Sequence, residues 1–149
     1  MITWTATATG LVNDGGWVIN DNGRTLRFNV EDSLDTCGSV NPFTQTGTAT
    51  AMFTLDQAAE LTATVSGLGE PFNSGSEVMT VFLDGLEIAQ GQSSEVQDPP
   101  TCDSIAIEAV STPTVLEAGT YTISIDFTTS DEKFHSGVFF QTDLQFVPV

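Results

Sequence analysis

Apolar and polar residues alternate along most of this chain, and the alternation has the two-residue period of a β-strand. The clearest runs cover residues 59–67, 104–110, 119–129 and 137–146. Helical periodicity is almost absent, since only residues 55–60 read as a helical turn and that run is too short to weigh. The alternation predicts these inward-facing side chains: Leu61, Val65, Tyr121, Ile123, Ile125, Phe127, Phe140, Leu144 and Phe146.

Turn residues separate the runs as β-hairpins require. The dipeptides Asn22-Gly23 and Asp84-Gly85 each stand between two strand-like runs, and both favour the positive-φ turns of hairpins. The longest loops are predicted at residues 31–44 and 91–103. Roughly eight to ten short strands without crossover helices predict an all-β fold, an antiparallel two-sheet β-sandwich of jelly-roll-like connectivity.

Length and composition favour a single domain over residues 1–149. Hydrophobic residues make up 40% of the chain and ten of them are phenylalanines, so disorder is not expected despite the charge. Three basic and twenty acidic residues give a formal net charge of −17. Such a surface repels phosphate backbones and anionic lipid headgroups, and nucleic-acid and membrane partners are therefore not expected. The acidity serves either solubility alone or contact with a basic partner or with cations.

The chain's two cysteines, Cys37 and Cys102, both lie in polar, loop-like surroundings. Buried structural thiols usually lie within apolar strands, so a disulfide joining the two loops is one interpretation, and two unpaired thiols is the other. An unstrained bridge would close a long loop and contribute about 4 kcal/mol. Residues 1–10 show no targeting segment, which predicts synthesis in the cytoplasm unless a leader has been removed.

The only histidine, His135, lies in a tight turn that leads into a phenylalanine-rich strand. Any Ser-His or Cys-His mechanism would have to use it, yet no nucleophile motif accompanies it. Paired carboxylates stay conceivable among twenty acids, although no pair is marked by its surroundings. We therefore expect a structural role for His135, hydrogen-bonded within its own turn, and no enzymatic activity.

Residue type alone leaves a calcium site open. The turns at residues 12–16, 19–23 and 128–135 offer the Asp and Asn oxygens that calcium accepts. None of the three has EF-hand spacing, and such residues often serve the turn itself. Zinc is not expected with one histidine and two separated cysteines.

Residue type also leaves carbohydrate binding open. A β-sandwich that binds sugars would use outward-facing aromatic side chains. Trp4, Trp17 and Phe139 each lie where a strand could turn them outward. Core packing or a subunit interface would explain the same three residues equally well.

The order of features from about Phe53 to Phe146 resembles β-sandwich domains in the virion proteins of tailed phages, including cyanophages. The most specific pieces are the corner T-x-D-x-x-F-H-x-G at residues 129–137 and the hairpin V-F-L-D-G at residues 81–85. Such domains serve as capsid cement (decoration) proteins or as distal tips of tailspikes. Cement proteins of this kind commonly cap local symmetry axes as trimers.

The resemblance implies a non-enzymatic protein on the outer capsid surface of a virion, where it would bind the major capsid protein and stabilise contacts between capsomers. It implies a homo-oligomer, in particular a trimer, and a corner that Asp131 and His135 lock before the last strand. The alternative is a carbohydrate-binding β-sandwich module that recognises host-surface glycan, free or on a tailspike.

The N-terminal 44 residues lie outside the resemblance, and we expect much of the oligomer or capsid contact there. Threonine-rich strands in this region have edges that could extend a neighbour's sheet. Ile2, Trp4 and Trp17 would anchor the contact. Arg24 and Arg27, two of only three cations, could pair with acids of a neighbouring subunit.

Overall fold

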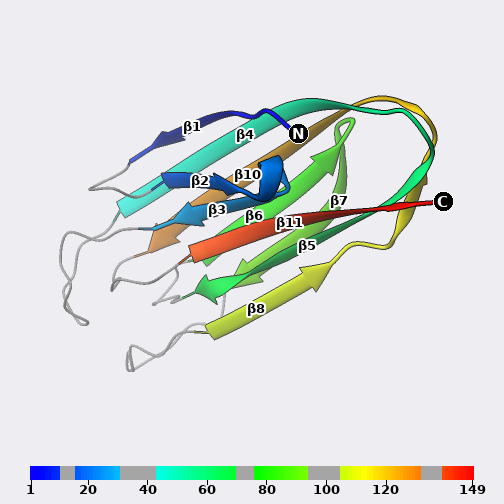
Figure 1. Cartoon of the computed structure of the whole chain (residues 1–149). Helices are drawn as coiled ribbons and strands as arrows, with labels where there is room; N and C mark the ends of the chain where they lie inside the picture. Colours follow the sequence, from blue (N-terminus) through cyan, green and yellow to red (C-terminus); the bar gives the residue numbers. More distant parts are fainter. Residues whose placement is uncertain (11–15, 31–42, 70–75, 94–104, 132–138) are drawn as a thin grey trace.

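The chain folds as two antiparallel β-sheets packed face to face (Figure 1). The computed structural model describes residues 1–10, 16–30, 43–69, 76–93, 105–131 and 139–149. Sheet A contains, in spatial order, β1 (Thr5–Thr9), β4 (Phe43–Leu55), β10 (Gly119–Asp131), β6 (Ser76–Leu83) and β7 (Leu86–Ser93). Sheet B contains, in spatial order, β2 (Gly16–Asn20), β3 (Thr25–Asn29), β11 (Phe139–Pro148), β5 (Ala59–Gly69) and β8 (Ile105–Val110), and β9 (Thr114–Leu116) also pairs with β5.

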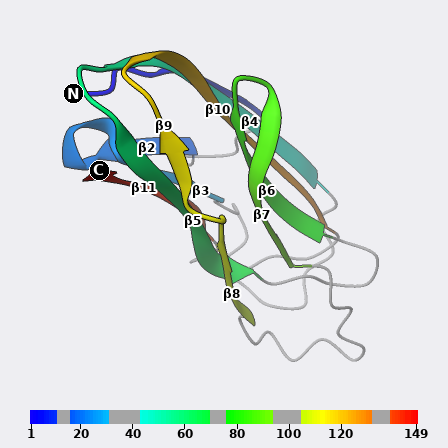
Figure 2. The same cartoon turned by 90° about the vertical axis from the view of Figure 1, so that its right-hand side faces the viewer.

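Successive strands cross repeatedly from one sheet to the other, in the jelly-roll-like manner that we expect from the sequence. Strand β4 of sheet A leads into β5 of sheet B, and β9 of sheet B leads into β10 of sheet A. Figures 1 and 2 show that both crossings lie at the same end of the sandwich. The predicted all-β sandwich is therefore confirmed.

Three phenylalanine rings join the two sheets at the centre of the core. Phe127 comes from sheet A, whereas Phe28 and Phe140 come from sheet B, and none of the three is more than 1% exposed. The Phe127 ring centroid lies 4.5 Å from that of Phe28 and 5.3 Å from that of Phe140. Among the predicted inward side chains, Tyr121 and Phe146 are only partly buried, and all the others are buried.

Both predicted hairpins form, with different turns. Asp84 and Gly85 make a two-residue turn with φ angles of 47° and 83°, since Leu83 and Leu86 on either side pair with each other. The turn between β2 and β3 is longer and contains η1 (Asp21–Gly23), a short 3-10 turn with positive φ at all three residues. No helix in the described ranges is long and apolar enough to cross a membrane.

The loop predictions need correction at two boundaries. Residues 43 and 44 belong to β4, and β7 continues to Ser93. The inward positions of β4 from Gln45 to Ala51 carry small or polar side chains, so this part of the strand has little contrast in hydrophobicity between its faces. Alternation is a weak signal where the buried side chains are this small.

The central rings generate the first prediction. We expect the Phe127→Ala variant to lose about 3–5 kcal/mol of unfolding free energy, because the cavity would lie between two fully buried rings. Urea denaturation followed by tryptophan fluorescence measures this loss. The exposed neighbour Thr128, changed to alanine, is the matched control and should stay within about 0.5 kcal/mol of the wild type. Equal losses in the two variants would contradict this account of the core.

Candidate functional site

Several predicted site residues lie outside the described part of the chain. Cys37, Cys102 and His135 belong to this group, so the disulfide and the histidine's place in the corner stay predictions. Asp131 is the last residue of β10, where it pairs with Phe43, but its side chain is not among those described.

Ile2 and Trp4 fasten the N-terminal segment to the turn η1. The Ile2 side chain is buried in the core, and its backbone N–H donates to the Asn22 carbonyl at 2.9 Å. The half-buried Trp4 ring donates from Nε1 to the Gly23 carbonyl at 2.7 Å. These two side chains stabilise the chain's own fold, and their predicted contact with another subunit stays a prediction.

Trp17 joins β2 of one sheet to β1 of the other. Its Nε1 donates to the Thr7 carbonyl at 3.0 Å, and its ring packs edge-on against Phe28 with centroids 5.1 Å apart. A Cβ atom added at Gly47 would lie 2.8 Å from Nε1 of Trp17 and 2.5 Å from the Phe28 ring, so glycine is required there. Trp17 therefore links the two sheets at the edge of the sandwich where β1 and β2 lie.

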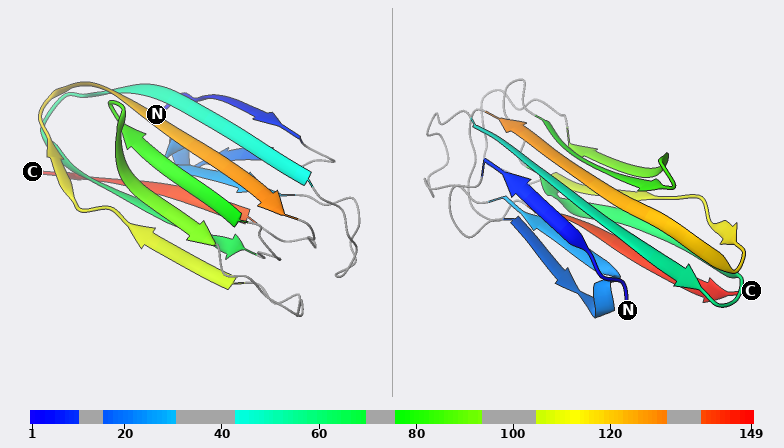
Figure 3. Two further views of the ribbon diagram at one scale, coloured as in Figure 1. Left: turned by 180° about the vertical axis from the view of Figure 1, so that it is seen from behind. Right: turned by 90° about the horizontal axis from the view of Figure 1, so that it is seen from above.

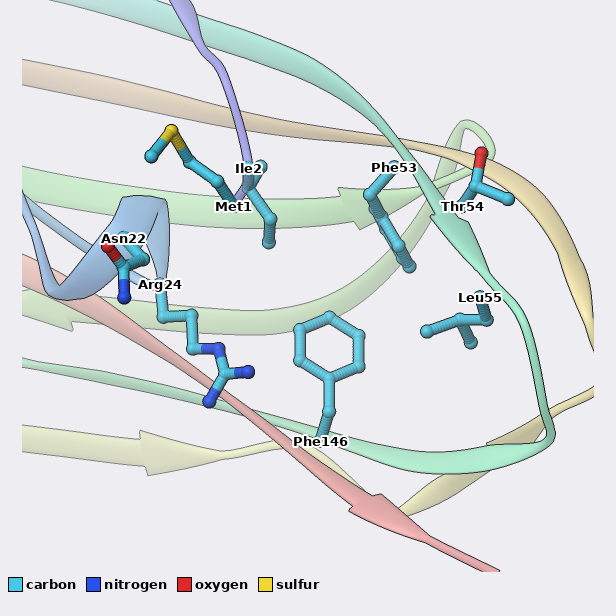
Figure 4. Close-up of a pocket in the computed structure, with 8 residues that line it drawn as sticks. All are labelled: Met1, Ile2, Asn22, Arg24, Phe53, Thr54, Leu55 and Phe146. Atoms are coloured by element: carbon cyan, nitrogen blue, oxygen red, sulfur yellow. The ribbon is translucent and has the colours of Figure 1, made fainter.

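Arg24 borders a small cavity between the sheets (Figure 4). Its side chain is exposed, while its backbone carbonyl accepts a hydrogen bond from the Leu144 N–H at 2.8 Å. The cavity measures about 230 Å³, which is below the usual size of ligand pockets and suits water or a small group. Its lining residues are Met1, Ile2, Asn22, Arg24, Phe53, Thr54, Leu55 and Phe146.

Arg27 belongs to a different site, on the outer face of sheet B. Strands β3 and β11 are neighbours there, and their register pairs Arg27 with Gln141 and Thr25 with Asp143. All four side chains lie on the outward face, because they alternate with fully buried residues such as Leu26 and Thr142. We call this group of four the Arg27–Asp143 network.

Hydrogen bonds connect the Arg27–Asp143 network from end to end. Arg27 Nε donates to Gln141 Oε1 at 3.1 Å, and Gln141 Nε2 donates to Asp143 Oδ2 at 2.9 Å. Thr25 Oγ1 donates to the other carboxylate oxygen, Oδ1 of Asp143, at 2.8 Å. Each link fixes the orientation of the next side chain, although all of them are partly open to solvent.

Phe139 supplies an aromatic surface beneath this network. The Arg27 Cζ atom lies 4.0 Å from the centroid of the Phe139 ring, which is a cation–π contact. Phe139 is half-buried and faces outward, in contrast to the adjacent Phe140. Of the three aromatic residues considered for outward positions, Phe139 alone lies on an outer sheet face, whereas Trp4 and Trp17 pack against the core and bond to backbone carbonyls.

The β5 neighbours of Gln141 and Asp143 are polar and uncharged, and the first acid beyond them is Glu108 of β8, which pairs with Ser66. On β5, Ser66 pairs with Gln141 and Thr64 with Asp143, and on β3 Asn29 pairs with Phe139. The guanidinium and the carboxylate balance each other within the network. A chain of net charge −17 thus has an electrically balanced patch here, with fixed donors and acceptors around a ring.

Sequence reasoning identified parts of this site without joining them. The inward positions predicted for Phe140 and Leu144 imply that Gln141 and Asp143 face outward, and Arg27 was expected to contact a neighbouring subunit. The pairing of Arg27 with Gln141 depends on the order of strands in the sheet, and residues 27 and 141 lie far apart in the sequence. The one sequence signal for Arg27 is the alternation of polar and apolar residues over 25–28, which places Arg27 on the face opposite Leu26 and Phe28.

A row of buried polar side chains crosses the inner face of sheet A. Thr129 pairs with Gln45 on one side and Glu77 on the other, and Glu77 pairs with Ser93. All four side chains are at most 3% exposed. The Ser93 and Thr129 hydroxyl oxygens have no hydrogen-bond partner within the described ranges. The sequence did not predict this row, because alternation marks a position as inward only when it is apolar.

The calcium ligands considered from the sequence receive little support. In the turn at residues 19–23, the carbonyl oxygens of Asp21, Asn22 and Gly23 already accept hydrogen bonds from Arg24, Ile2 and Trp4. Within the part of the chain that the structure describes, no three His, Cys, Asp or Glu side chains come together as metal ligands. Each of the other two turns lies partly outside the described residues.

Comparison with known proteins does not assign the chain to a family. No protein-family model and no curated protein matches the sequence. The chain is similar to the structure of TmCBM61 in complex with β-1,4-galactotriose, with 10% identity, a TM-score of 0.42, and 98% of this chain and 88% of that chain covered. It is similar to the PA14 sugar-binding domain from an RTX adhesin, with 11% identity, a TM-score of 0.41 and coverage of 97% and 89%.

A phage protein is also among the similar structures. The tripod from the baseplate of bacteriophage Tuc2009 shares 16% identity over 95% of this chain and 75% of that chain, with a TM-score of 0.38. All three likenesses are distant and concern the β-sandwich architecture.

The N-terminal fastening generates the second prediction. We expect Trp4→Phe to lower the unfolding free energy by about 1–2 kcal/mol, because the carbonyl of the buried Gly23 would lose its donor. Tyr121→Phe is the control, since it removes an exposed hydrogen bond to the Glu117 carbonyl and should cost less than about 0.5 kcal/mol. Chemical denaturation of both variants measures the difference. If Trp4→Phe is no more costly than the control, the indole hydrogen bond does not hold the segment.

Proposed function

We propose that the protein is a non-catalytic carbohydrate-binding module that binds glycan on the outer face of sheet B. The observation that carries this proposal is the Arg27–Asp143 network, fixed by hydrogen bonds above the Phe139 ring. A sugar presents neighbouring hydroxyl groups at its edge and C–H groups on its face. Guanidinium, amide and carboxylate groups bind paired hydroxyls, and an aromatic side chain contacts C–H groups.

The network is ordered before any ligand arrives, which favours binding. Side chains that are free to rotate lose conformational entropy when a ligand fixes them. The Gln141 amide is held on both sides, by Arg27 and by Asp143, so little of this loss remains. The same fixed spacing of donors and acceptors would select among glycans by the arrangement of their hydroxyls.

Charge narrows the class of glycan. The network is balanced in charge, whereas the whole chain carries −17. An anionic polysaccharide would be repelled at long range, and a neutral one would not. The outward positions of β11 from Phe139 to Gln145 span about 20 Å at roughly 3.3 Å per residue, so a chain of several sugar units could lie along the strand.

A capsid cement protein is the second candidate function. The specific observation in its favour is an uncharged edge strand, β2, with exposed apolar side chains suited to contact with another protein chain. In this interpretation a homo-oligomer, expected as a trimer, binds the major capsid protein on the outer capsid surface. Retention of the purified protein on capsids tests it, and a protein that never binds capsids would exclude it.

The third prediction tests the glycan proposal. Neutral glycans on an array should bind the wild-type protein, and Gln141→Ala should weaken the best interaction at least about tenfold, or about 1.4 kcal/mol. The matched control is Gln92→Ala, which removes an exposed glutamine from β7 of sheet A and should leave binding unchanged. Phe139→Ala should lose affinity as well. Circular dichroism and thermal unfolding confirm that each variant is folded.

Two outcomes would contradict this function. One is the absence of binding to every neutral glycan at millimolar concentration. The other is equal affinity of Gln141→Ala and Gln92→Ala, which would place any glycan site away from the Arg27–Asp143 network.

A further inference from the structure

Strand β2 is the edge of sheet B next to the network. Within the described ranges its backbone pairs on one side only, with β3, so its other side presents unpaired N–H and C=O groups. Figure 3 shows β2 along the margin of the sandwich, near β1 of the opposite sheet. An edge of this kind is a template for another strand.

Four other strands lie at sheet edges, and each is protected in a way that β2 is not. Strand β9 is only three residues long, which is too short to be a good template. Strands β7 and β8 lie against each other, and each carries an exposed acid, Glu87 and Glu108. A register shift beside Val81 also interrupts the pairing of β6 with β7. Strand β1 is covered in part by the Trp17 indole, which bonds to the Thr7 carbonyl.

Strand β2 has none of these protections. Its sequence, Gly-Trp-Val-Ile-Asn, contains no charged residue and no proline. Val18 is 42% exposed and Ile19 is 41% exposed, although they point to opposite faces of the strand. Natural proteins usually guard such an edge with lysine, proline or a bulge, and an unguarded edge indicates that pairing is tolerated or used.

A cavity beside β2 can receive a side chain from an added strand. It measures about 430 Å³ and lies between the N-terminal segment and the end of β2. Its lining combines the apolar Met1, Trp4 and Ile19 with polar residues of the adjoining turn, among them Asp21. The edge therefore offers both backbone groups for pairing and a pocket for a neighbouring apolar residue.

We propose that the occupant of this edge is the β2 strand of a second copy, paired antiparallel. Charge is the reason for choosing a copy of the same chain. Two bodies of net charge −17 repel each other, so a contact between copies is opposed least on a strand that carries no charge. Strand β2 itself, the seam of the proposed dimer, carries no charge. The nearest charged residues on the adjoining turn and strand are the acid Asp21 of η1 and the cations Arg24 and Arg27.

The pairing has a defined symmetry. Two identical antiparallel edges are related by a two-fold axis perpendicular to the sheet, so the contact closes at two copies. The two B sheets become one continuous sheet, and both outer faces lie on the same side. Resting on the proposed glycan function, this arrangement presents two Arg27–Asp143 networks to one glycan-bearing surface and raises avidity.

Salt dependence separates this contact from an ion-paired one. Because the bodies repel and the seam is apolar, added salt should screen the repulsion and strengthen the dimer. A contact made by ion pairs would weaken instead.

The fourth prediction is tested by sedimentation equilibrium of the full chain without glycan. We expect the mass to rise with concentration from that of a monomer to that of a dimer, and the dimer to tighten between about 0.05 M and about 0.5 M NaCl. Val18→Glu should weaken the dimer at least about tenfold, because two acids would face each other across the seam. Val110→Glu is the matched control, since it adds the same charge to β8, the other edge of sheet B, at a residue that is 57% exposed.

Each result is decisive. A wild-type chain that stays monomeric, a trimeric mass, weakening by salt, or equal loss in the two variants would overturn the proposal. If Val18→Glu does not fold, hydrogen exchange on the wild type replaces it, and the β2 amides should gain protection as concentration rises. Failure of glycan binding leaves these masses unchanged, and a monomeric chain leaves the Gln141→Ala comparison intact, so the two proposals fail separately.

Discussion

The close approach of the two sheets at Gly47 is the constraint on which the rest of the structure depends. Phe28 and Trp17 of sheet B press against this glycine, and any Cβ there would collide with both rings. Large side chains on one sheet therefore require small ones on the other, and β4 supplies Gly47, Ala49 and Ala51. Between Gln45 and Ala51, Gly47 is the one inward glycine of β4. Phe28 of β3 can therefore lie only opposite Gly47, which fixes how the two strands lie across the core.

The packing of this core determines which side chains lie on the outer face of sheet B. Since successive side chains of a strand point to opposite faces, the burial of Phe28 and Phe140 forces Arg27 and Gln141 outward. A slip of one residue in β11 would bury Gln141 and expose Phe140, at the cost of a fully buried aromatic ring. The network thus needs little stabilisation of its own, and surface hydrogen bonds of modest strength suffice to hold it.

The sequence predicted those features that a single strand determines. Alternation identified the buried faces of β5, β10 and β11, and the Asp-Gly dipeptide at 84–85 identified a two-residue turn. It missed β4, whose buried side chains from Gln45 to Ala51 are small or polar, and it could not bring Arg27 to Gln141 across more than a hundred residues. Pairing between distant strands depends on the order of the whole sheet, which local alternation does not encode. The tryptophans illustrate the same limit, because their partners, Gly23 and Thr7, are backbone carbonyls that no pattern of side chains reveals.

The β2 edge proposed for dimerisation and the sheet B face proposed for glycan binding are adjacent. Dimerisation at the edge would therefore affect how tightly the face holds a glycan-bearing surface. Val18 of the open edge pairs with Arg27 of the network, so a second strand at β2 would lie one strand away from the glycan face. A partly exposed polar network binds a neutral sugar weakly, because each contact replaces one that water already made. Two such faces on one continuous sheet would turn a weak interaction into a useful one without any new contact, provided that the glycans on the target surface match their spacing. The proposed dimer seam and the proposed glycan face are therefore compatible with each other in a strongly acidic chain, because neither would depend on attraction by charge.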